Sequence, residues 1–282
     1  MSAAPVSKQK ERPDFMKGIY IPPQPAIIEE IRDASPDLPR IAKLIGKDAG
    51  ISANVIRTVN SPAYNLPNKI SSINQAVMML GLDSVINIVN GLMIRTAFEK
   101  YNTDDLVEFW ELNEEMALCC SLLARRFDVA DTEQAYLLGL FHNCGIPAMA
   151  KKFPNYNGLL REAYSQLEVA AMEYISQRLN TNHTLIGYLI ARNWKLPDPV
   201  SEAIREQGDR ARLYQRSPPT DGLLICLKLA EQICAAPRRL SGVVESAQWP
   251  VIAEEVFREL CISEEDFADL EHEIREQMIL VG

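Results

Sequence analysis

Apolar residues recur every three or four positions along nearly the whole chain, which is the spacing that lines one face of an α-helix. Between residues 84 and 98, for example, Val85, Ile88, Val89 and Leu92 share one helical face. Alternating polar and apolar runs joined by tight turns, which are typical of β-hairpins, are missing from the sequence. The pattern therefore predicts an all-α protein.

Residues 21–100 predict a series of short helices with clear start and stop signals. Prolines in the stretch 22–25 favour an extended segment, followed by a helix from Ala26 to Ala34. Gly81 suits the left-handed position that ends a helix beginning at Ile73. Side chains that can cap a helix N-terminus precede the successive helices: Ser35 or Asp37, Ser52, Ser72 and Asp83.

From Thr103 onward the predicted helices become longer. Asp131 can cap a helix that runs to the turn at His142, and Ser263 can cap the last helix of the chain. The other expected helices span residues 103–126, 147–153, 156–166, 169–180, 182–194, 198–207 and 223–234. We therefore expect three regions: a disordered lead at 1–20, an N-terminal helical subdomain at 21–100, and a helical bundle with C-terminal helices at 101–282.

Composition narrows the class of protein. The chain has 282 residues, of which 47% are hydrophobic and 24% charged, as is ordinary for a globular protein. A net charge of -9 argues against a broad nucleic-acid interface. The polar N-terminus lacks a secretory signal, no apolar run approaches the roughly 20 residues of a membrane span, and the cysteines form no C-x-x-C motif. These features predict a cytoplasmic protein with no nucleic-acid or membrane partner.

The most informative motif is the pentapeptide Phe141–Gly145, in which His142 is followed by Asn143. A histidine followed by aspartate can offer a metal ion one imidazole and one bridging carboxylate. Asn143 keeps the shape of aspartate, but its neutral amide cannot supply that charge. His183 also lies at a predicted helix end, and Glu231 is a further carboxylate. For the histidines a core or cap role is the simpler interpretation, and for the glutamate an exposed helix position.

Two further groups of residues are weaker candidates. Four arginines around the loop at 208–219 are candidates for anion binding, although neighbouring acidic residues favour a solvated basic loop: Arg205, Arg210, Arg212 and Arg216. The turn after the third predicted helix is a candidate interaction surface, although capping of a helix junction is the simpler interpretation. Its residues are Asn60, Ser61, Pro62 and Tyr64.

Several motifs follow one another in the order typical of a known family: Asn60-Ser61-Pro62-Ala63-Tyr64, Ile70–Ala76, Leu80-Gly81-Leu82, Gly139–Gly145, and His183 with Gly187, Trp194, Leu196 and Pro197. By these motifs the chain resembles the HDOD family, whose members are HD-related output domains, mostly of bacterial signalling proteins. The stretch Gly139–Gly145 is similar to the family's GLLHDIG motif. The resemblance covers about Ile21 to Glu231.

The resemblance implies an all-helical fold in which an N-terminal array of short helices packs on an HD-type bundle. It also implies a relation to metal-dependent phosphohydrolases, although the domain commonly lacks the complete catalytic set. This chain departs from the pattern at the positions to which the resemblance assigns further ligands: Leu112-Asn113, Asn143, Gln207-Gly208 and Glu231. Only His142, Asn143, His183 and Glu231 remain as residual metal candidates, so we expect no cofactor.

Three functions follow as hypotheses. The first is a non-catalytic signal-transduction module with a degenerate metal site, which acts through contacts with a protein partner. The second is a phosphohydrolase acting on a nucleotide or phosphoester, which would need a divalent metal bound by the residual candidates. The third is an anion or nucleotide sensor that uses the cleft of the degenerate metal site and the arginines at 205–216, but no motif supports it.

Overall fold

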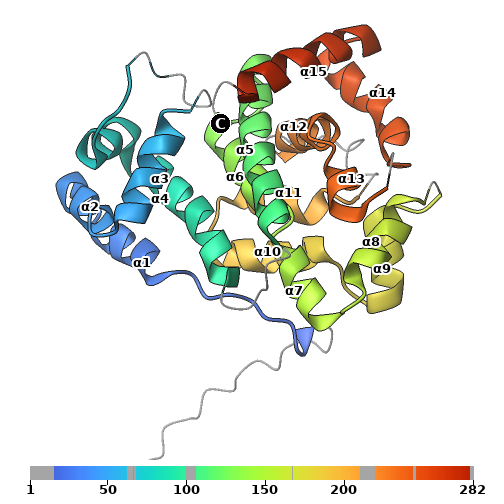
Figure 1. The fold of residues 1–282 in the computed structure, drawn as a ribbon, viewed down its shortest axis with the longest axis horizontal. Helices are drawn as coiled ribbons and strands as arrows, with labels where there is room; N and C mark the ends of the chain where they lie inside the picture. Colours follow the sequence, from blue (N-terminus) through green and yellow to red (C-terminus); the bar gives the residue numbers. More distant parts are fainter. Residues whose placement is uncertain are drawn as a thin grey trace, which may run out of the picture.

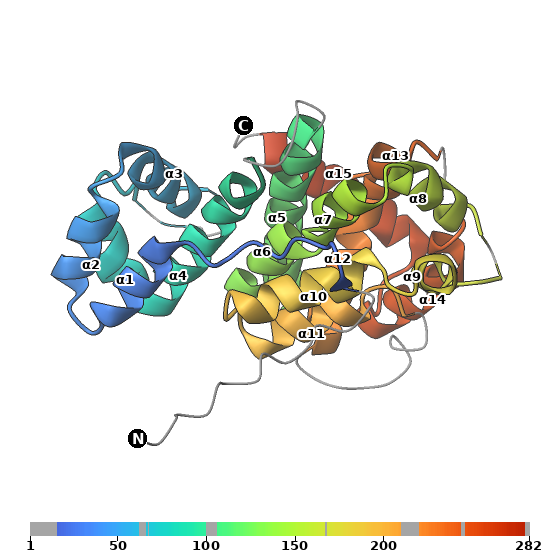
Figure 2. The same cartoon turned by 90° about the horizontal axis from the view of Figure 1, so that it is seen from below.

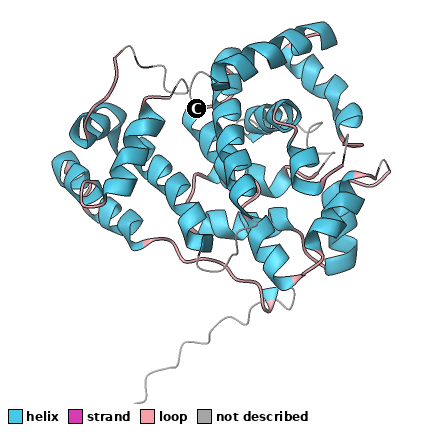
Figure 3. Cartoon of the chain, viewed as in Figure 1, coloured by secondary structure: helices cyan, strands magenta, loops and turns pink. Residues whose placement is uncertain are grey.

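A computed structural model of the protein describes residues 16–61, 66, 68–99, 106–166, 168–209, 220–243 and 246–279. Within these ranges the regular structure is helical and no strand occurs (Figure 3). This confirms the all-α fold that the spacing of apolar residues predicts.

The helices follow one another with short connections. The first four are α1 (Ala26–Asp33), α2 (Leu38–Ile45), α3 (Ala49–Val59) and α4 (Ile73–Glu99). The bundle that follows contains α5 (Val107–Phe127), α6 (Thr132–Phe141), α7 (Gly145–Lys152), α8 (Tyr156–Tyr164), α9 (Ala171–Leu179), α10 (His183–Asn193), α11 (Asp198–Glu206) and α12 (Thr220–Ile233). The C-terminal helices are α13 (Ala236–Ser241), α14 (Trp249–Leu260) and α15 (Glu264–Ile279). The sequence pattern provided no bounds for α13 and α14.

Two hydrophobic cores hold these helices together. Figure 1 shows the two corresponding groups of helices, with α1 to α4 on the left and the bundle on the right. The small core lies among α1, α2, α3 and the first part of α4, and it includes Ile31, Val55 and Val85. The large core lies within the bundle and includes Ile94 and Phe98 from the last part of α4. The cores therefore divide within α4, whereas the sequence pattern placed the division near residue 100.

Capping side chains explain where the helices begin. Asp131 is the N-cap of α6, as expected, because its carboxylate accepts the backbone N–H of Gln134 at 2.8 Å. Asp48 caps α3 in the same way, accepting the backbone N–H of Ile51 at 2.9 Å. The prediction that Ser52 caps this helix was wrong, because Asp48 starts the helix one turn earlier.

Helix α4 is long and apolar, and Gly81 interrupts it with φ 78° and ψ -176°. Glycine adopts a positive φ without the steric penalty of a Cβ atom, so the interruption lies where the sequence predicts it. Among the described residues, the stretch Ile73–Phe98 is the one helix whose length and composition would suit a membrane span. Half of its most apolar window is buried inside the protein, as in the core helix of a globular domain.

The segment before α1, residues 19–24, crosses from the small core to the bundle beside α10 (Figure 2). The carbonyl oxygen of Pro22 accepts hydrogen bonds from Trp194 Nε1 at 3.0 Å and from Asn193 Nδ2 at 3.2 Å. Ile19 is buried in the large core. The end of the expected disordered lead is therefore packed against the bundle, and residues 1–15 lie outside the described ranges.

Candidate functional site

The pentapeptide motif closes α6, and both of its polar side chains are buried. His142 Nδ1 lies 2.7 Å from the carbonyl oxygen of Gly139, and His142 Nε2 lies 2.7 Å from Asn143 Nδ2. The carbonyl can only accept and the amide nitrogen can only donate. The imidazole of His142 is therefore neutral, with its proton on Nδ1, and the lone pair of Nε2 accepts the Asn143 amide.

His183 is the first residue of α10 and is likewise buried. Asn182 positions it by capping the helix, since the Asn182 side chain accepts the backbone N–H of Leu185 at 2.9 Å. His183 Nδ1 lies 2.9 Å from the hydroxyl oxygen of Tyr156, and the two rings meet edge to face. One nitrogen of each histidine is thus engaged by a neighbouring polar side chain.

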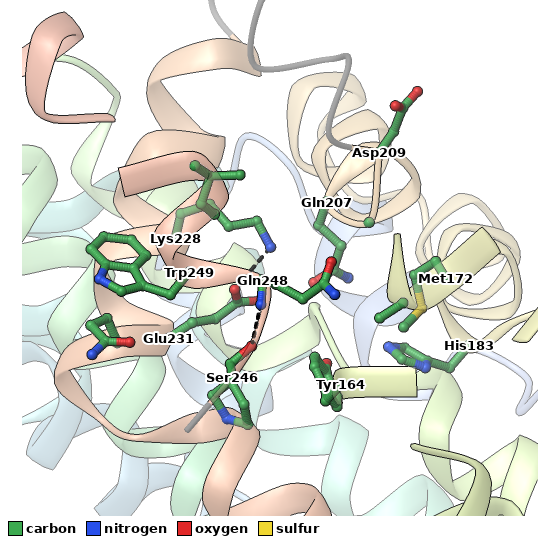
Figure 4. Close-up of a pocket in the computed structure, with 15 residues that line it drawn as sticks. Tyr164, Met172, His183, Gln207, Asp209, Lys228, Glu231, Ser246, Gln248 and Trp249 are labelled. Atoms are coloured by element: carbon green, nitrogen blue, oxygen red, sulfur yellow. Dashed lines mark hydrogen bonds and ion pairs between the residues drawn. The ribbon is translucent and has the colours of Figure 1, made fainter. Parts of the chain in front are cut away.

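Lys228 and Glu231 face these histidines from α12. Lys228 Nζ lies 2.8 Å from Glu231 Oε2, and the two side chains are only 12% and 20% exposed. Together with His183 and Gln207 they line a cavity of about 60 Å³, shown in Figure 4. We call the two histidines, Asn143, Gln207, Lys228 and Glu231 the histidine site.

At Gln207-Gly208 the resemblance expects a pair of histidines, and this chain fills the space differently. Gln207 Nε2 donates to the carbonyl oxygen of His142 at 2.6 Å and to that of Ile204 at 3.2 Å. A Cβ atom on Gly208 would lie 2.1 Å from Cγ of Met172, so the Met172 side chain occupies the place of any side chain at 208. A histidine cannot stand there without displacing Met172.

At Leu112-Asn113, where the resemblance expects a further histidine, the chain also offers no replacement ligand. Leu112 is buried in the large core. Asn113 is completely buried, and neither its amide oxygen nor its amide nitrogen has a hydrogen-bond partner. Such unpaired groups cost free energy, and no contact in the described structure compensates them.

The donor atoms of the histidine site do not fit a divalent metal. The Nε2 lone pair of His142 is used by Asn143, and the carboxylate of Glu231 is neutralised by Lys228. Within the ranges that the structure describes, no group of three or more histidine, cysteine, aspartate or glutamate side chains is arranged to hold a metal ion. Catalytic metal centres use three or more such ligands with an open water position.

The turn after α3 is organised around Asn60. Asn60 Oδ1 accepts the backbone N–H of Ile70 at 2.7 Å, and Asn60 Nδ2 donates to the carbonyl oxygens of Ile70 and Ile56 at 2.8 and 2.9 Å. Asn60 therefore ties the end of α3 to the segment that leads into α4, which is the architectural role considered above. Ser61 follows it, and Pro62 and Tyr64 lie outside the described residues.

The candidate anion-binding arginines are only partly described. The guanidinium of Arg205 lies 2.6 Å from Glu202 and 3.0 Å from Glu206, and it stacks over the ring of Tyr188. These contacts already use its charge. The other three, Arg210, Arg212 and Arg216, lie outside the described ranges, so their grouping stays a prediction.

One residue of the histidine site and two residues that contact it were missed by the sequence reasoning. Lys228 precedes Glu231 by three positions on one helix, a spacing that signals an ion pair. Met172 and Tyr156 reach the site from α9 and α8, and no local signal marks them. Such contacts depend on the tertiary packing.

Burial of the two histidines predicts a pH dependence of stability. It lowers the pKa of His142 to about 4 and, together with the charges of His142 and Lys228, that of His183 to about 3. In the unfolded chain both groups titrate near pH ~6.5, so the unfolded state binds more protons at lower pH. Above that pH the two histidines do not lower the free energy of unfolding. On acidification below it, the free energy of unfolding falls by up to about 1.4 kcal/mol per pH unit for each histidine.

Urea unfolding near neutral pH and near pH ~5 measures this loss. His183→Gln is expected to lose less stability on acidification than the wild type. His272→Gln changes an exposed histidine of α15 and is expected to behave like the wild type. An equal loss of stability on acidification in His183→Gln and the wild type would show that burial of His183 does not cause the pH dependence.

Comparison with known proteins agrees with this fold. The chain matches the HDOD domain family over residues 21–209. An HDOD domain protein from Geobacter sulfurreducens is 22% identical, with a TM-score of 0.66 and 95% of each chain covered. A candidate phosphohydrolase from Shewanella amazonensis is 21% identical, with a TM-score of 0.64 and 92% of this chain and 93% of that chain covered. At these identities the likeness shows the shared fold.

A curated relative bears the name of an enzyme. Cyclic di-GMP phosphodiesterase CdgJ from Vibrio cholerae is 27% identical over 136 residues, which are 46% of this chain and 30% of CdgJ. The matches span between 28% and 37% of the length of the curated relatives. The activity in that name therefore belongs to a protein of which this chain matches less than a third.

Proposed function

The chain belongs to the HDOD family, and from this premise we propose that it is a non-catalytic signal-transduction module that acts through contacts with a protein partner. The family is related to metal-dependent phosphohydrolases and to signalling proteins. We choose between these two functions by the histidine site, whose geometry supports the regulatory one.

The observation that carries the proposal is the hydrogen bond from Asn143 Nδ2 to His142 Nε2. A catalytic member would present that nitrogen lone pair to a metal ion. Here the Asn143 amide donates to that lone pair, so both ring nitrogens of His142 are hydrogen-bonded within the protein. Gln207 closes the same network by donating to the His142 carbonyl oxygen.

The size of the cavity also argues against a nucleotide substrate. Its volume of about 60 Å³ is much smaller than the roughly 300–1,000 Å³ of typical small-molecule sites. Gln248 and Trp249 at the start of α14 form part of its lining (Figure 4). The space suits a few water molecules better than a phosphoester.

The first part of α4 offers a surface for protein contacts. Met78 and Met79 are 65% and 50% exposed, although they belong to the helix that supplies the small core with Val77 and Val85. Neighbouring exposed methionines adapt to different partner surfaces. They support a recognition role for the part of the molecule formed by α1 to α4.

The alternative function is a metal-dependent phosphohydrolase, as the name of the Vibrio cholerae relative suggests. The non-catalytic function and the phosphohydrolase function are distinguished first by measuring the metal content of protein purified without chelator. Turnover of a panel of nucleotides, cyclic di-GMP and a generic phosphodiester is then assayed with added Mn²⁺. We expect no stoichiometric metal and no turnover. The variant Asn143→Asp is also expected to be inactive, because Met172 and Gln207 still fill the other ligand positions.

Turnover that disappears in His142→Ala would overturn the proposal. Turnover gained by Asn143→Asp alone would show that one substitution, and not the whole site, accounts for the loss of activity.

A further inference from the structure

Lys228 is the one residue of the histidine site that no motif and no resemblance assigns. Its side chain is 12% exposed, and Nζ lies 2.8 Å from a carboxylate oxygen of Glu231. It lines the same cavity as His183 and Gln207. Figure 4 shows the Lys228 amine above the Glu231 carboxylate, with Gln207 and His183 on the other side of the cavity.

The position of this amine is unusual for an ion pair within one helix. Pairs at a spacing of three residues normally lie on the solvent face, where water screens the attraction between the two charges. Here both side chains are largely buried, and they share the cavity with the apolar side chains of Met172, Trp249 and Ile252. A carboxylate enclosed in this way needs a nearby positive charge, because removing it from water is costly.

In a metal-binding relative of this fold, the positive charge beside the carboxylate would come from the metal ion. The donor set of this chain does not fit such an ion, and the amine stands beside the same carboxylate. We infer that the Lys228 ammonium replaces the metal as the resident cation of the site, compensating Glu231 and keeping the histidine site closed without a metal. This inference rests on the proposed non-catalytic function and specifies how the site is stabilised.

Chemical rescue tests the inference. Lys228→Ala removes the ammonium and leaves space for a small amine, so its Tm is expected to fall by about 4–8 °C. Added propylammonium chloride is expected to recover about half of this loss relative to sodium chloride at equal ionic strength. Lys228→Met is the matched control, because it lacks the charge but fills the space, and propylammonium is expected to leave its Tm unchanged.

Removal of the carboxylate gives a second, independent readout. Lys228→Ala/Glu231→Gln contains no unpaired charge, so it is expected to be more stable than Lys228→Ala and insensitive to propylammonium. If Lys228→Ala does not fold, Lys228→Met and Lys228→Met/Glu231→Gln provide the same comparison, with the double variant expected to have the higher Tm.

An unchanged Tm in Lys228→Ala would overturn the inference. So would a loss that neither propylammonium nor Glu231→Gln reduces, because the lysine stem would then act through packing alone. These results leave the non-catalytic function standing. A Tm of the wild type that rises on addition of Mn²⁺, accompanied by turnover, would instead refute the proposed function and the inference together.

Discussion

Gly145→Ala is expected to destabilise the protein by about 3–4 kcal/mol, which corresponds to a fall in Tm of about 10 °C. A Cβ atom at position 145 would lie 2.0 Å from the carbonyl oxygen of His183 and 2.8 Å from the backbone nitrogen of Gly187. Both neighbours are backbone atoms of α10, so no side-chain rotation can relieve the clash. Helix α7 would have to move away from α10, the helix that carries His183.

Thermal unfolding followed by circular dichroism measures this effect, with Gly50→Ala as the matched control. At Gly50 the nearest atom to an added Cβ is the capping carboxylate oxygen of Asp48 at 3.2 Å, a side-chain atom that needs to shift by only a few tenths of an ångström, so a change of less than about 1 kcal/mol is expected. Gly139 behaves like Gly145, because its Cβ would lie 2.4 Å from Cα of Ala117. A stable Gly145→Ala variant would show that the last glycine of the pentapeptide motif is not required for packing.

Trp194→Ala is expected to cost about 3–5 kcal/mol, the range measured for removing a large buried aromatic side chain. The indole of Trp194 is completely buried and packs edge to face on Phe141, with 5.7 Å between ring centroids. Its Nε1–H also donates to the carbonyl oxygen of Pro22. The substitution therefore removes part of the large core and one attachment of the segment at residues 19–24.

Trp194→Phe separates these two contributions. It keeps an aromatic ring but lacks the N–H group, so the loss of stability is expected to be about 1–2 kcal/mol, with faster proteolysis within residues 19–24. Trp249→Phe is the control, since Trp249 packs on Phe257 and Phe267 in a different part of the bundle. If limited proteolysis cleaves the segment equally in both variants, the Pro22 hydrogen bond does not hold it in place.

The positions of most helices could be read from the sequence because their signals are local. The cap at Asp131, the interruption at Gly81 and the turn at His142 each depend on a few neighbouring residues. Ser52 was misassigned because two capping side chains lie within one turn of each other, and the sequence alone does not rank them. Residues 16–20 belong to the lead that was expected to be disordered, but Ile19 is buried in the large core and Tyr20 packs edge to face on Phe98.

Most residues of the candidate site could be predicted from the sequence, but the contacts that block its donor atoms could not. The sequence marked His142, His183 and Glu231, and His183 and Glu231 indeed line one cavity. It did not show that Asn143 would donate to the imidazole, or that Met172 would fill the space beside Gly208. These contacts are set by the packing of helices that are distant in the sequence, and that packing decides whether the donor atoms are free.

Helix α4 joins the two cores in a way that has a mechanical consequence. After Gly81 the helix continues without interruption, with Val85 and Val89 in the small core and Ile94 and Phe98 in the large core. Each end of this one helix is therefore packed in a different core. At its C-terminal end the ring of Phe98 lies 6.1 Å from that of Trp110, measured between ring centroids. A force applied to the end of α4 that lies in the small core is therefore transmitted along one helix to Phe98 and its neighbour Trp110 in the large core.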